Sequence, residues 1–441
     1  MDFSLPADLV NYLARLDAFI AAEIAPLQAQ DDNQRFFDHR REWARTDFEG
    51  GGLPRREWEE LLHEARRRAD RAGFYRFSLP REYGGDGGSN LWMAVIREHL
   101  ASQGLGLHND LQNEHSVVGN FPFIVMVRDF GSPAQKEQFI RGSLDGQVIV
   151  AFGLTEPLHG SDATHMETHA VREQRGGVDG WRIDGEKMWT TGMHVATHCV
   201  VFARTSGEAG RAKGISAFLV PTTTPGVKVE EYLWTFNMPT DHPRVSLTNV
   251  WVPDSAVFGA IDHGLPIAQA FVHENRIRQA ASSLGAAVFC INESVRYARE
   301  RKPFGKALAE NQAIQWPLVE LATQAEMLRQ LIRKTAWEMD QMPHPEVAHR
   351  LSDKVSMCNY WANRLCCEAA DRAMQVHGGI GYSRHKPFEH IYRHHRRYRI
   401  TEGSEEIQMR KVAGFLFGYI GPRRAEFETL QWSDVDYRGA S

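Results

Sequence analysis

The spacing of apolar residues changes twice along this chain, and these changes constrain the fold more than any other feature. Apolar residues recur at helical spacing up to about residue 145, as at Leu9, Tyr12 and Leu16. Short β-type runs separated by Gly-rich turns replace them from about 147 to 256. From about 265 the helical period returns and persists. The sequence therefore predicts an α+β protein with helical, β and helical parts in that order.

The predicted parts can be given limits. A chain of 441 residues is long enough for about two to four domains with a sizeable core. Residues 36–52, which contain three consecutive glycines, are expected to form a surface insertion between helices. We expect an N-terminal helical domain at 1–146 and a small middle β-barrel or sandwich at 147–258. A C-terminal four-helix bundle is expected at 259–425 and a tail at 426–441.

The charge balance disfavours one class of function. The chain has 51 Lys plus Arg against 56 Asp plus Glu, which gives a formal net charge of −5. A general nucleic-acid binder is normally basic, so we do not expect a nucleic acid as a partner. The balance is compatible with a small anionic ligand, provided that basic residues gather locally.

No segment has the pattern of a membrane span or an export signal. No apolar run approaches the roughly 18 residues that a spanning helix needs. The N-terminal residues lack the pattern of a secretory or mitochondrial signal, and the last residues are not a peroxisomal address, so we expect a cytoplasmic protein. The cysteines are odd in number and lack a Cys-x-x-Cys pair, which is typical of buried free thiols. They are Cys199, Cys290, Cys358, Cys366 and Cys367.

Short motifs rich in glycine carry the chemical information. Glu402-Gly403-Ser404 places a carboxylate beside a backbone that can approach a ligand closely, because Gly has no Cβ. Alone, this tripeptide is more often the start of a helix than a catalytic site. Other motifs elsewhere in the chain favour the catalytic interpretation. They are Thr155-Glu156-Pro157 followed by Gly160-Ser161-Asp162, then Lys187-Met188-Trp189-Thr190-Thr191-Gly192, Arg301-Lys302-Pro303-Phe304-Gly305 and Gln375-Val376-His377-Gly378-Gly379-Ile380-Gly381.

In this order and at these separations, the motifs resemble those of the acyl-CoA dehydrogenase family of flavoenzymes, over about residues 70–415. The resemblance implies the cofactor FAD and an acyl-CoA substrate, which is oxidised to the trans-2-enoyl-CoA. A base takes the α-proton, and the β-hydrogen leaves as hydride to flavin N5, since no side chain accepts a hydride. The resemblance also implies electron-transfer flavoprotein as the electron acceptor and a homodimer or homotetramer as the assembly.

The resemblance assigns the general base to Glu402, whose backbone N–H would also bind the thioester oxygen. Some members of the family place the base immediately before an arginine that matches Arg276. Here that residue is Asn275, which cannot act as a base, and Glu274 points about 100° away on a helix. We therefore expect Glu402 to be the catalytic residue, and we expect no metal site.

The resemblance also assigns the binding residues, although Thr-Glu-Pro and Gly-Ser-Asp are ordinary turn formers and a Trp is more often core. Thr191 is expected to bond toward flavin N5, and Arg301, Phe304 and Gln312 to reach the cofactor of a neighbouring subunit. The expected substrate contacts are Ser161, Arg276 and Gly403. The expected cofactor contacts are Phe152, Leu154, Thr155, Gly160, Ser161, Trp189, Thr191, Arg301, Phe304, Gln312, Gln375, Gly378, Gly379, Ser404 and Glu406.

Alternatives remain open at this point. An acyl-CoA oxidase, which uses O2, often has an added C-terminal domain, whereas this chain ends about 25 residues after its last clear helical run. A flavin-containing, DNA-associated relative would be expected to carry a basic extra domain. The basic run His394-His395-Arg396-Arg397 is typical of a solvated helix face, with an anion contact as the second interpretation. Neighbouring histidines do not share a helical face, which disfavours a metal.

Overall fold

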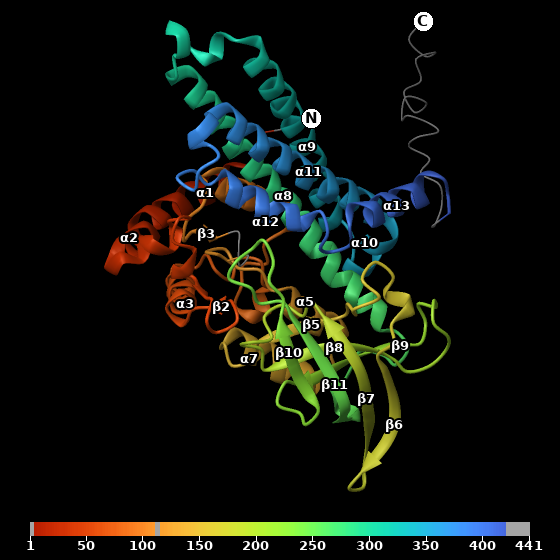
Figure 1. Cartoon of the computed structure of the whole chain (residues 1–441). Coiled ribbons are helices and arrows are strands. Elements are labelled where there is room, and N and C mark those ends of the chain that lie inside the picture. The colour runs from red at the N-terminus through yellow and green to blue at the C-terminus, as the bar shows by residue number, and fades with distance from the viewer. Residues whose placement is uncertain (1–3, 111–114, 420–441) are drawn as a thin grey trace, which may run out of the picture.

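The computed structural model describes residues 4–110 and 115–419, so the predicted tail at 426–441 lies outside the described residues. A curled sheet, yellow to green at the bottom of Figure 1, lies below the C-terminal helices in green to blue, and the N-terminal helices in red and orange lie to one side. The predicted α+β class and the order of its three parts are therefore confirmed. Among the described helices, none is both long enough and apolar enough to cross a membrane.

The N-terminal region is mainly helical. The stripe of Leu9, Tyr12 and Leu16 is buried, as its spacing predicts, and Tyr12 and Leu16 share a core with Trp58 of the next long helix. Ser89 caps the helix that follows, because its hydroxyl accepts a hydrogen bond from the N–H of Trp92 at 3.2 Å. The elements are α1 Ala7–Phe19, α2 Ala25–Ala29, α3 Arg56–Arg71, α4 Asn90–Ser102, α5 Pro122–Phe130, α6 Pro133–Gln135 and α7 Arg141–Leu144, with strands β1 Thr46–Asp47, β2 Leu53–Pro54, β3 Asn109–Asp110 and β4 His115–Ser116.

The prediction of a surface insertion at 36–52 is wrong for part of that segment. Its glycines Gly50 and Gly51 are exposed, but Arg45 is only 5% exposed. The Arg45 guanidinium pairs with Asp110 at 2.9 Å and lies 4.2 Å from the centre of the Trp58 ring. A buried ion pair and an aromatic contact therefore tie the segment to the helical core.

The middle region is one sheet with the strand order β10-β11-β7-β6-β8-β9-β12, and β5 pairs in parallel with β8. Alternating residues of β8 pack into two different cores: Val201 lies inside the curl, while Val200 and Phe202 face α5 and the first turns of the next long helix. The strands are β5 Val150–Gly153, β6 His169–Arg175, β7 Val178–Met188, β8 His198–Arg204, β9 Ile215–Pro221, β10 Val227–Tyr232, β11 Pro243–Pro253 and β12 Val257–Phe258.

The C-terminal region is a helical bundle built on one long helix. The helices are α8 Gly264–Glu300, α9 Gln312–Asp340, α10 His344–Arg350, α11 Ser352–His377, α12 Phe388–Tyr398 and α13 Glu405–Leu416. Their shared core contains Leu284, Leu328 and Leu365, from α8, α9 and α11. Helix α4 also packs on α8 and α9, which joins the N-terminal region to the bundle. All five cysteines are buried and free, so that prediction is confirmed.

Candidate active site

Glu402 lies in the short loop between α12 and α13 and has an unusual backbone conformation. Its φ is 57° and that of Gly403 is 86°, both in the left-handed region. Glycine adopts this region freely, whereas a residue with a Cβ is strained there. Ser404 then starts α13 as its cap, since its hydroxyl accepts a hydrogen bond from the N–H of Ile407 at 3.4 Å. The carboxylate is thus presented from a strained loop that a helix N-terminus holds.

Arg276, on α8, holds this loop through the main chain. Its Nε donates to the Glu402 carbonyl oxygen at 2.9 Å and its Nη2 donates to the same oxygen at 2.5 Å. A Cβ on residue 403 would lie 2.7 Å from Nη2, so only glycine lets the guanidinium approach. Burial lowers the pKa of Arg276 to about 10, against the opposing effect of Glu402. The structure thus shows Arg276 bound to the Glu402 carbonyl oxygen. Its contact with the substrate stays a prediction.

The neighbours of Arg276 on α8 differ in their relation to Glu402. The Asn275 amide nitrogen lies 3.5 Å from a carboxylate oxygen of Glu402. The Glu274 carboxylate is half-buried, and its negative charge helps to raise the pKa of Arg128. Asn275, which sequence reasoning only excluded as a base, therefore lies next to the expected base itself.

Glu405 closes the loop from the other side. Its carboxylate accepts from Arg399 at 2.9 and 3.0 Å and from Arg364 at 2.9 Å. The hydrogen bond from Arg399, together with that from Arg364 and the two positive charges, lowers the pKa of Glu405 to about 2, against burial, which raises it. Arg399 and Glu405 therefore clamp the two ends of the loop that carries Glu402.

We expect Glu405→Gln to lower the stability at pH 7 by about 1–2 kcal/mol and to flatten its acid dependence. The folded-state pKa of Glu405 is depressed, so its contribution is present above the ordinary value of 4.5 and is lost as the pH falls toward about 2. Urea unfolding midpoints between pH 7 and pH 3 measure this. Glu208→Gln, at an exposed position outside the predicted site, is the control and should change neither quantity. Equal acid dependence in Glu405→Gln and the wild type would contradict the expectation.

On the sheet side, a buried ion pair supports the Thr-Glu-Pro motif. The Lys187 ammonium donates to the Glu156 carboxylate at 2.8 Å, and both side chains are almost completely buried. The N–H groups of Glu167 and Thr168 also donate to this carboxylate, at 2.5 and 2.9 Å. Burial alone would raise the pKa of Glu156, but Lys187 and these hydrogen bonds lower it overall. Both residues belong to the motifs that carry the resemblance, although neither was expected to bind the cofactor or the substrate.

The ion pair fixes two segments that carry predicted cofactor residues. The N–H of Met188 donates to the Thr155 carbonyl at 2.9 Å, so the motif loop and the end of β7 lie side by side. Trp189 follows β7 with its side chain 46% exposed, and Thr191 is also exposed. Predicted residues from two motifs are thereby brought together at one edge of the sheet.

Backbone strain marks three of the predicted site residues. Among the described residues, seven other than glycine have a positive φ. Four of these are Asp or Asn, which tolerate the left-handed region, and the other three are Trp189, Phe304 and Glu402. Strained backbone of this kind concentrates at functional sites. The structure therefore singles out one residue from each of three motifs, on a criterion independent of the resemblance.

A pair of stacked rings connects the sheet to the helix that holds Glu402. Phe152 on β5 lies 4.5 Å from Phe271 on α8, with the ring planes 11° apart. Phe271 precedes Asn275 by one helical turn, so β5 meets α8 just before the segment that contacts Glu402. The edge of the sheet and the loop that carries Glu402 therefore lie near the same segment of α8.

A second group of predicted residues gathers at the opposite end of α8. Tyr297 stacks on His377 at 4.3 Å, which places the end of α8 beside the end of α11. At 1.5 Å per residue, the 25 positions from Arg276 to Arg301 correspond to about 37 Å. All members of this group are exposed, and they are Arg301, Phe304, Gln312, Gln375, Gly378 and Gly379.

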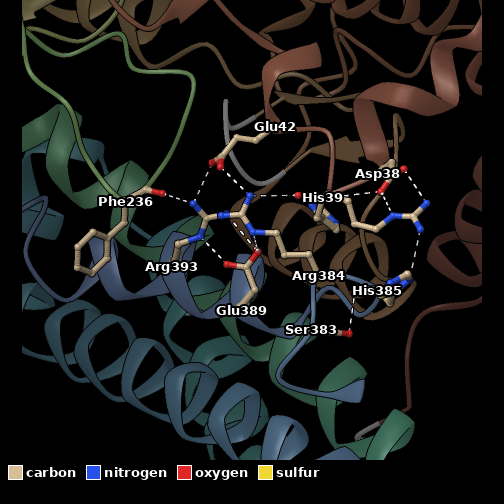
Figure 2. Close-up of polar contacts among 10 residues, drawn as sticks. Asp38, His39, Glu42, Phe236, Ser383, Arg384, His385, Glu389 and Arg393 are labelled. Carbon is tan, nitrogen blue, oxygen red and sulfur yellow. Dashed lines mark hydrogen bonds and ion pairs between the residues drawn. The ribbon is translucent and has the colours of Figure 1, made fainter. Parts of the chain in front are cut away.

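Helix α12, which leads to the loop of Glu402, is held by an ion-pair cluster (Figure 2). Arg393 lies between the carboxylates of Glu42 and Glu389, at 3.1 and 2.7 Å, and donates to the Phe236 carbonyl at 2.5 Å. Arg384 also pairs with Glu42, at 2.8 Å. The segment near residue 40, the loop at 236 and α12 are thereby joined.

The interpretation of the basic run as a solvated helix face is wrong for its histidines. The His394 and His395 side chains are fully buried. The His395 ring lies 2.8 Å from the Ser283 hydroxyl, and that of His394 lies 3.4 Å from the Asn237 amide nitrogen. Burial, with the nearby Arg397 charge, lowers the pKa of His395 to about 3. Both rings are therefore neutral packing partners of α8 and the loop at 237.

The residues present fit a flavin dinucleotide. Trp189 offers an exposed indole surface and Thr191 a hydroxyl beside it, which suit a planar ring with polar edges. A Cβ added at Gly378 or Gly379 would meet no atom within 4 Å, so the backbone there is open to a ligand. Arg301, on the same exposed end of the bundle, is the cationic fork that a pyrophosphate requires.

Comparisons with known proteins agree with this arrangement. Three family models match, described as acyl-CoA dehydrogenase N-terminal, middle and C-terminal domains, over residues 30–147, 151–250 and 262–417. The chain is 30% identical to the probable acyl-CoA dehydrogenase FadE2 of Mycobacterium tuberculosis, over 94% of this chain and 96% of that protein. It is also 30% identical to the caffeyl-CoA reductase-Etf complex subunit CarC of Acetobacterium woodii, over 78% of this chain and 87% of that protein.

A solved structure shows the same fold. The structure of a putative acyl-CoA dehydrogenase from Mycobacterium abscessus superposes with a TM-score of 0.79 at 27% identity, covering 95% of this chain and all of that chain. The family models together span most of the chain, in the order of its helical, β and helical parts. The chain therefore belongs to the acyl-CoA dehydrogenase family, whose members are FAD-dependent oxidoreductases acting on CH–CH groups.

Proposed function

We propose that this protein oxidises a saturated acyl-CoA to the trans-2-enoyl-CoA, with Glu402 as the general base. The observation that carries the proposal is the placement of Glu402. Its carboxylate stands in a strained loop that Arg276 holds through the main chain, next to the amide of Asn275. A carboxylate that its loop holds in a fixed position is suited to take a proton from a bound substrate.

The residues of the chain have separate tasks in this proposal. Glu402 removes the α-proton, and its own backbone N–H stabilises the negative charge that develops on the thioester oxygen. Bound FAD supplies the hydride acceptor that no side chain can supply. Phe152, Leu154, Thr155 and Trp189 line the sheet edge where the ring system would rest, and Ser161 and Gly403 are the proposed substrate contacts. Gly160, Ser404 and Glu406 complete the proposed set.

We propose electron-transfer flavoprotein as the electron acceptor. The support is that one relative described above is named as a subunit of a complex with this partner. The same relative is named a reductase, so net reduction of an enoyl-CoA is the second candidate direction. An oxidase that uses O2 and a flavin-containing, DNA-associated relative are the alternatives that remain from the sequence.

The test is anaerobic mixing of the FAD-loaded protein with a panel of acyl-CoAs and enoyl-CoAs. Bleaching of the flavin absorbance by a saturated acyl-CoA is expected, and its absence with every member of the panel would contradict the proposed reaction. Turnover with electron-transfer flavoprotein should then far exceed turnover with oxygen. Stoichiometric hydrogen peroxide at an equal rate would favour an oxidase instead.

We also propose that the chain works as a homodimer or homotetramer. Phe304 is wholly exposed just beyond the end of α8, and Arg301 at that end lies about 37 Å along the helix from Arg276. This separation favours binding of another subunit's cofactor by the residues at this end. Helix α9 supports this with large apolar side chains at helical spacing that are more than half exposed, which is unusual for a free surface. They are Trp316, Val319, Met327 and Trp337. The domain limits 1–146, 147–258 and 259–425 are part of the same proposal.

We expect Arg301→Ala to weaken FAD binding about 10- to 100-fold and to shift the assembly toward smaller species. A charge-assisted hydrogen bond to phosphate is lost, and its loss costs on the order of 1.5–3 kcal/mol. Flavin content and light scattering after gel filtration measure the two effects. Arg299→Ala, at an exposed position on the last turn of α8, is the matched control and should change neither. A monomeric wild type that binds FAD tightly would contradict the shared-site proposal.

A further inference from the structure

Thr191, the residue expected to bond toward flavin N5, has a partner that lies far away in the sequence. Its Oγ1 lies 2.8 Å from Nδ1 of His242, which stands 51 positions later in the chain. Asp241 Oδ1 lies 3.2 Å from the same nitrogen. The His242 side chain is only 12% exposed, whereas Thr191 is exposed. A largely buried imidazole thus contacts the hydroxyl of an exposed residue.

The backbone holds these groups together on both sides. The N–H of Gly192 donates to the Asp241 carbonyl at 3.0 Å, and the N–H of Leu233 donates to the His242 carbonyl at 3.0 Å. The His242 ring also meets the Trp189 ring edge-on, at 6.5 Å between centres. The imidazole is therefore fixed by main-chain contacts and by the indole expected to pack on the flavin.

A hydroxyl has a single hydrogen, so its partner decides where that hydrogen points. If Nδ1 of His242 carries no hydrogen, Thr191 must donate to it and presents only lone pairs outward. If Nδ1 carries a hydrogen, His242 donates, Thr191 accepts, and the hydroxyl hydrogen remains available for a ligand. The carboxylate of Asp241 at 3.2 Å favours the tautomer with the hydrogen on Nδ1.

We propose that His242, oriented by Asp241, is a positioning residue that directs the hydroxyl hydrogen of Thr191 toward the flavin. The inference rests on the proposed function, in which Thr191 faces the cofactor. His242 contacts neither substrate nor flavin in this proposal and acts only through Thr191. The motif that begins at Lys187 gives no sign of this role, because His242 lies far away in the sequence, in the segment directly before β11.

The tautomer of His242 can be measured directly. Nitrogen-15 NMR of the protein labelled at histidine distinguishes a ring nitrogen that carries hydrogen from one that does not. The His242→Asn variant identifies the signals by their loss. A neutral ring with its hydrogen on Nδ1, or a doubly protonated ring, is expected. A ring with Nδ1 bare would overturn the proposal, whatever the activity of the enzyme.

The FAD dissociation constant of the apoprotein tests the coupling between the two residues. His242→Leu removes the donor and should weaken FAD binding roughly two- to tenfold. His242→Asn places an amide N–H near the position of Nδ1 and should restore most of the affinity. Thr191→Val should weaken FAD binding to a similar extent, and the double variant Thr191→Val with His242→Leu should lose no more than Thr191→Val alone. His169→Leu, an exposed histidine on β6, is the control.

The outcomes separate this inference from the function on which it rests. If Thr191→Val leaves both the FAD dissociation constant and the flavin absorbance band unchanged, Thr191 does not face the cofactor, and the proposal fails with that part of the proposed function. If Thr191→Val weakens binding but His242→Leu does not, only the role of His242 is wrong. Additive losses in the double variant would also overturn it, because the two residues would then act independently.

Discussion

The Glu402→Gln variant is expected to keep its fold and its FAD but to reduce the flavin with acyl-CoA at least about 10²- to 10⁴-fold more slowly than the wild type. Glutamine has almost the shape of glutamate but cannot take the α-proton. The loop should persist, because Arg276 and Gln408 hold it through the carbonyl oxygens of residues 402 and 403, at 2.9 and 2.7 Å. Single-turnover flavin reduction, followed by absorbance with one good substrate, measures the effect.

Glu274→Gln is the matched control for this experiment. Glu274 is the other carboxylate near the position where some family members carry the base, but the residue before Arg276 is Asn275. We expect Glu274→Gln to slow flavin reduction much less than Glu402→Gln does. The residue of this segment that lies 3.5 Å from the Glu402 carboxylate is Asn275, not Glu274. Normal reduction in Glu402→Gln together with slow reduction in Glu274→Gln would show that the base is wrongly assigned within the correct family.

Lys187→Met is expected to lower the free energy of unfolding of the sheet by about 3–5 kcal/mol. The substitution leaves the Glu156 carboxylate buried without its cation, although the N–H groups of Glu167 and Thr168 still donate to it. An unpaired charge in a buried place is far more costly than a neutral group of similar size. The urea midpoint, followed by the fluorescence of Trp181, which is buried in the same sheet, measures the loss.

Two further variants make the interpretation specific to the buried pair. Adding Glu156→Gln to Lys187→Met removes the unpaired charge and should restore part of the stability. The restoration should be incomplete, because the N–H groups of Glu167 and Thr168 bond to different oxygens of Glu156 and glutamine keeps only one acceptor oxygen. Lys228→Met breaks a pair in which the Lys228 side chain is 70% exposed and should cost less than about 1 kcal/mol. Equal losses in Lys187→Met and Lys228→Met would contradict the role given to burial.

Loss of the Lys187 and Glu156 pair should also reach the cofactor site. The ion pair joins the Thr-Glu-Pro loop to the end of β7, two residues before Trp189. Any Lys187→Met protein that folds is therefore expected to hold FAD less tightly than the wild type. Weaker FAD binding would show that the ion pair supports the cofactor site. Unchanged FAD binding would show that it stabilises only the sheet.

The sequence by itself determined the class of the fold and the identity of the family. Both depend on information that is local in the chain. The apolar period changes near residues 147 and 265, and the sheet begins at Val150 and α8 at Gly264. Turn and cap chemistry is also local, so Ser404 could be expected at the start of a helix, where the structure places it. Period and capping need no partner from elsewhere in the chain.

Only the tertiary structure decided how the polar side chains are used. His394 and His395 are typical of a solvated face in sequence, yet packing against Ser283 and Asn237 buries both. Lys187 pairs with Glu156 across 31 positions. The partner of a polar side chain is set by which elements pack together, and the same residue types are stable in water or in a satisfied interior. The spacing of residues along the chain does not predict which elements pack together. The contacts around Glu402 and Thr191 could therefore be found only from the tertiary structure.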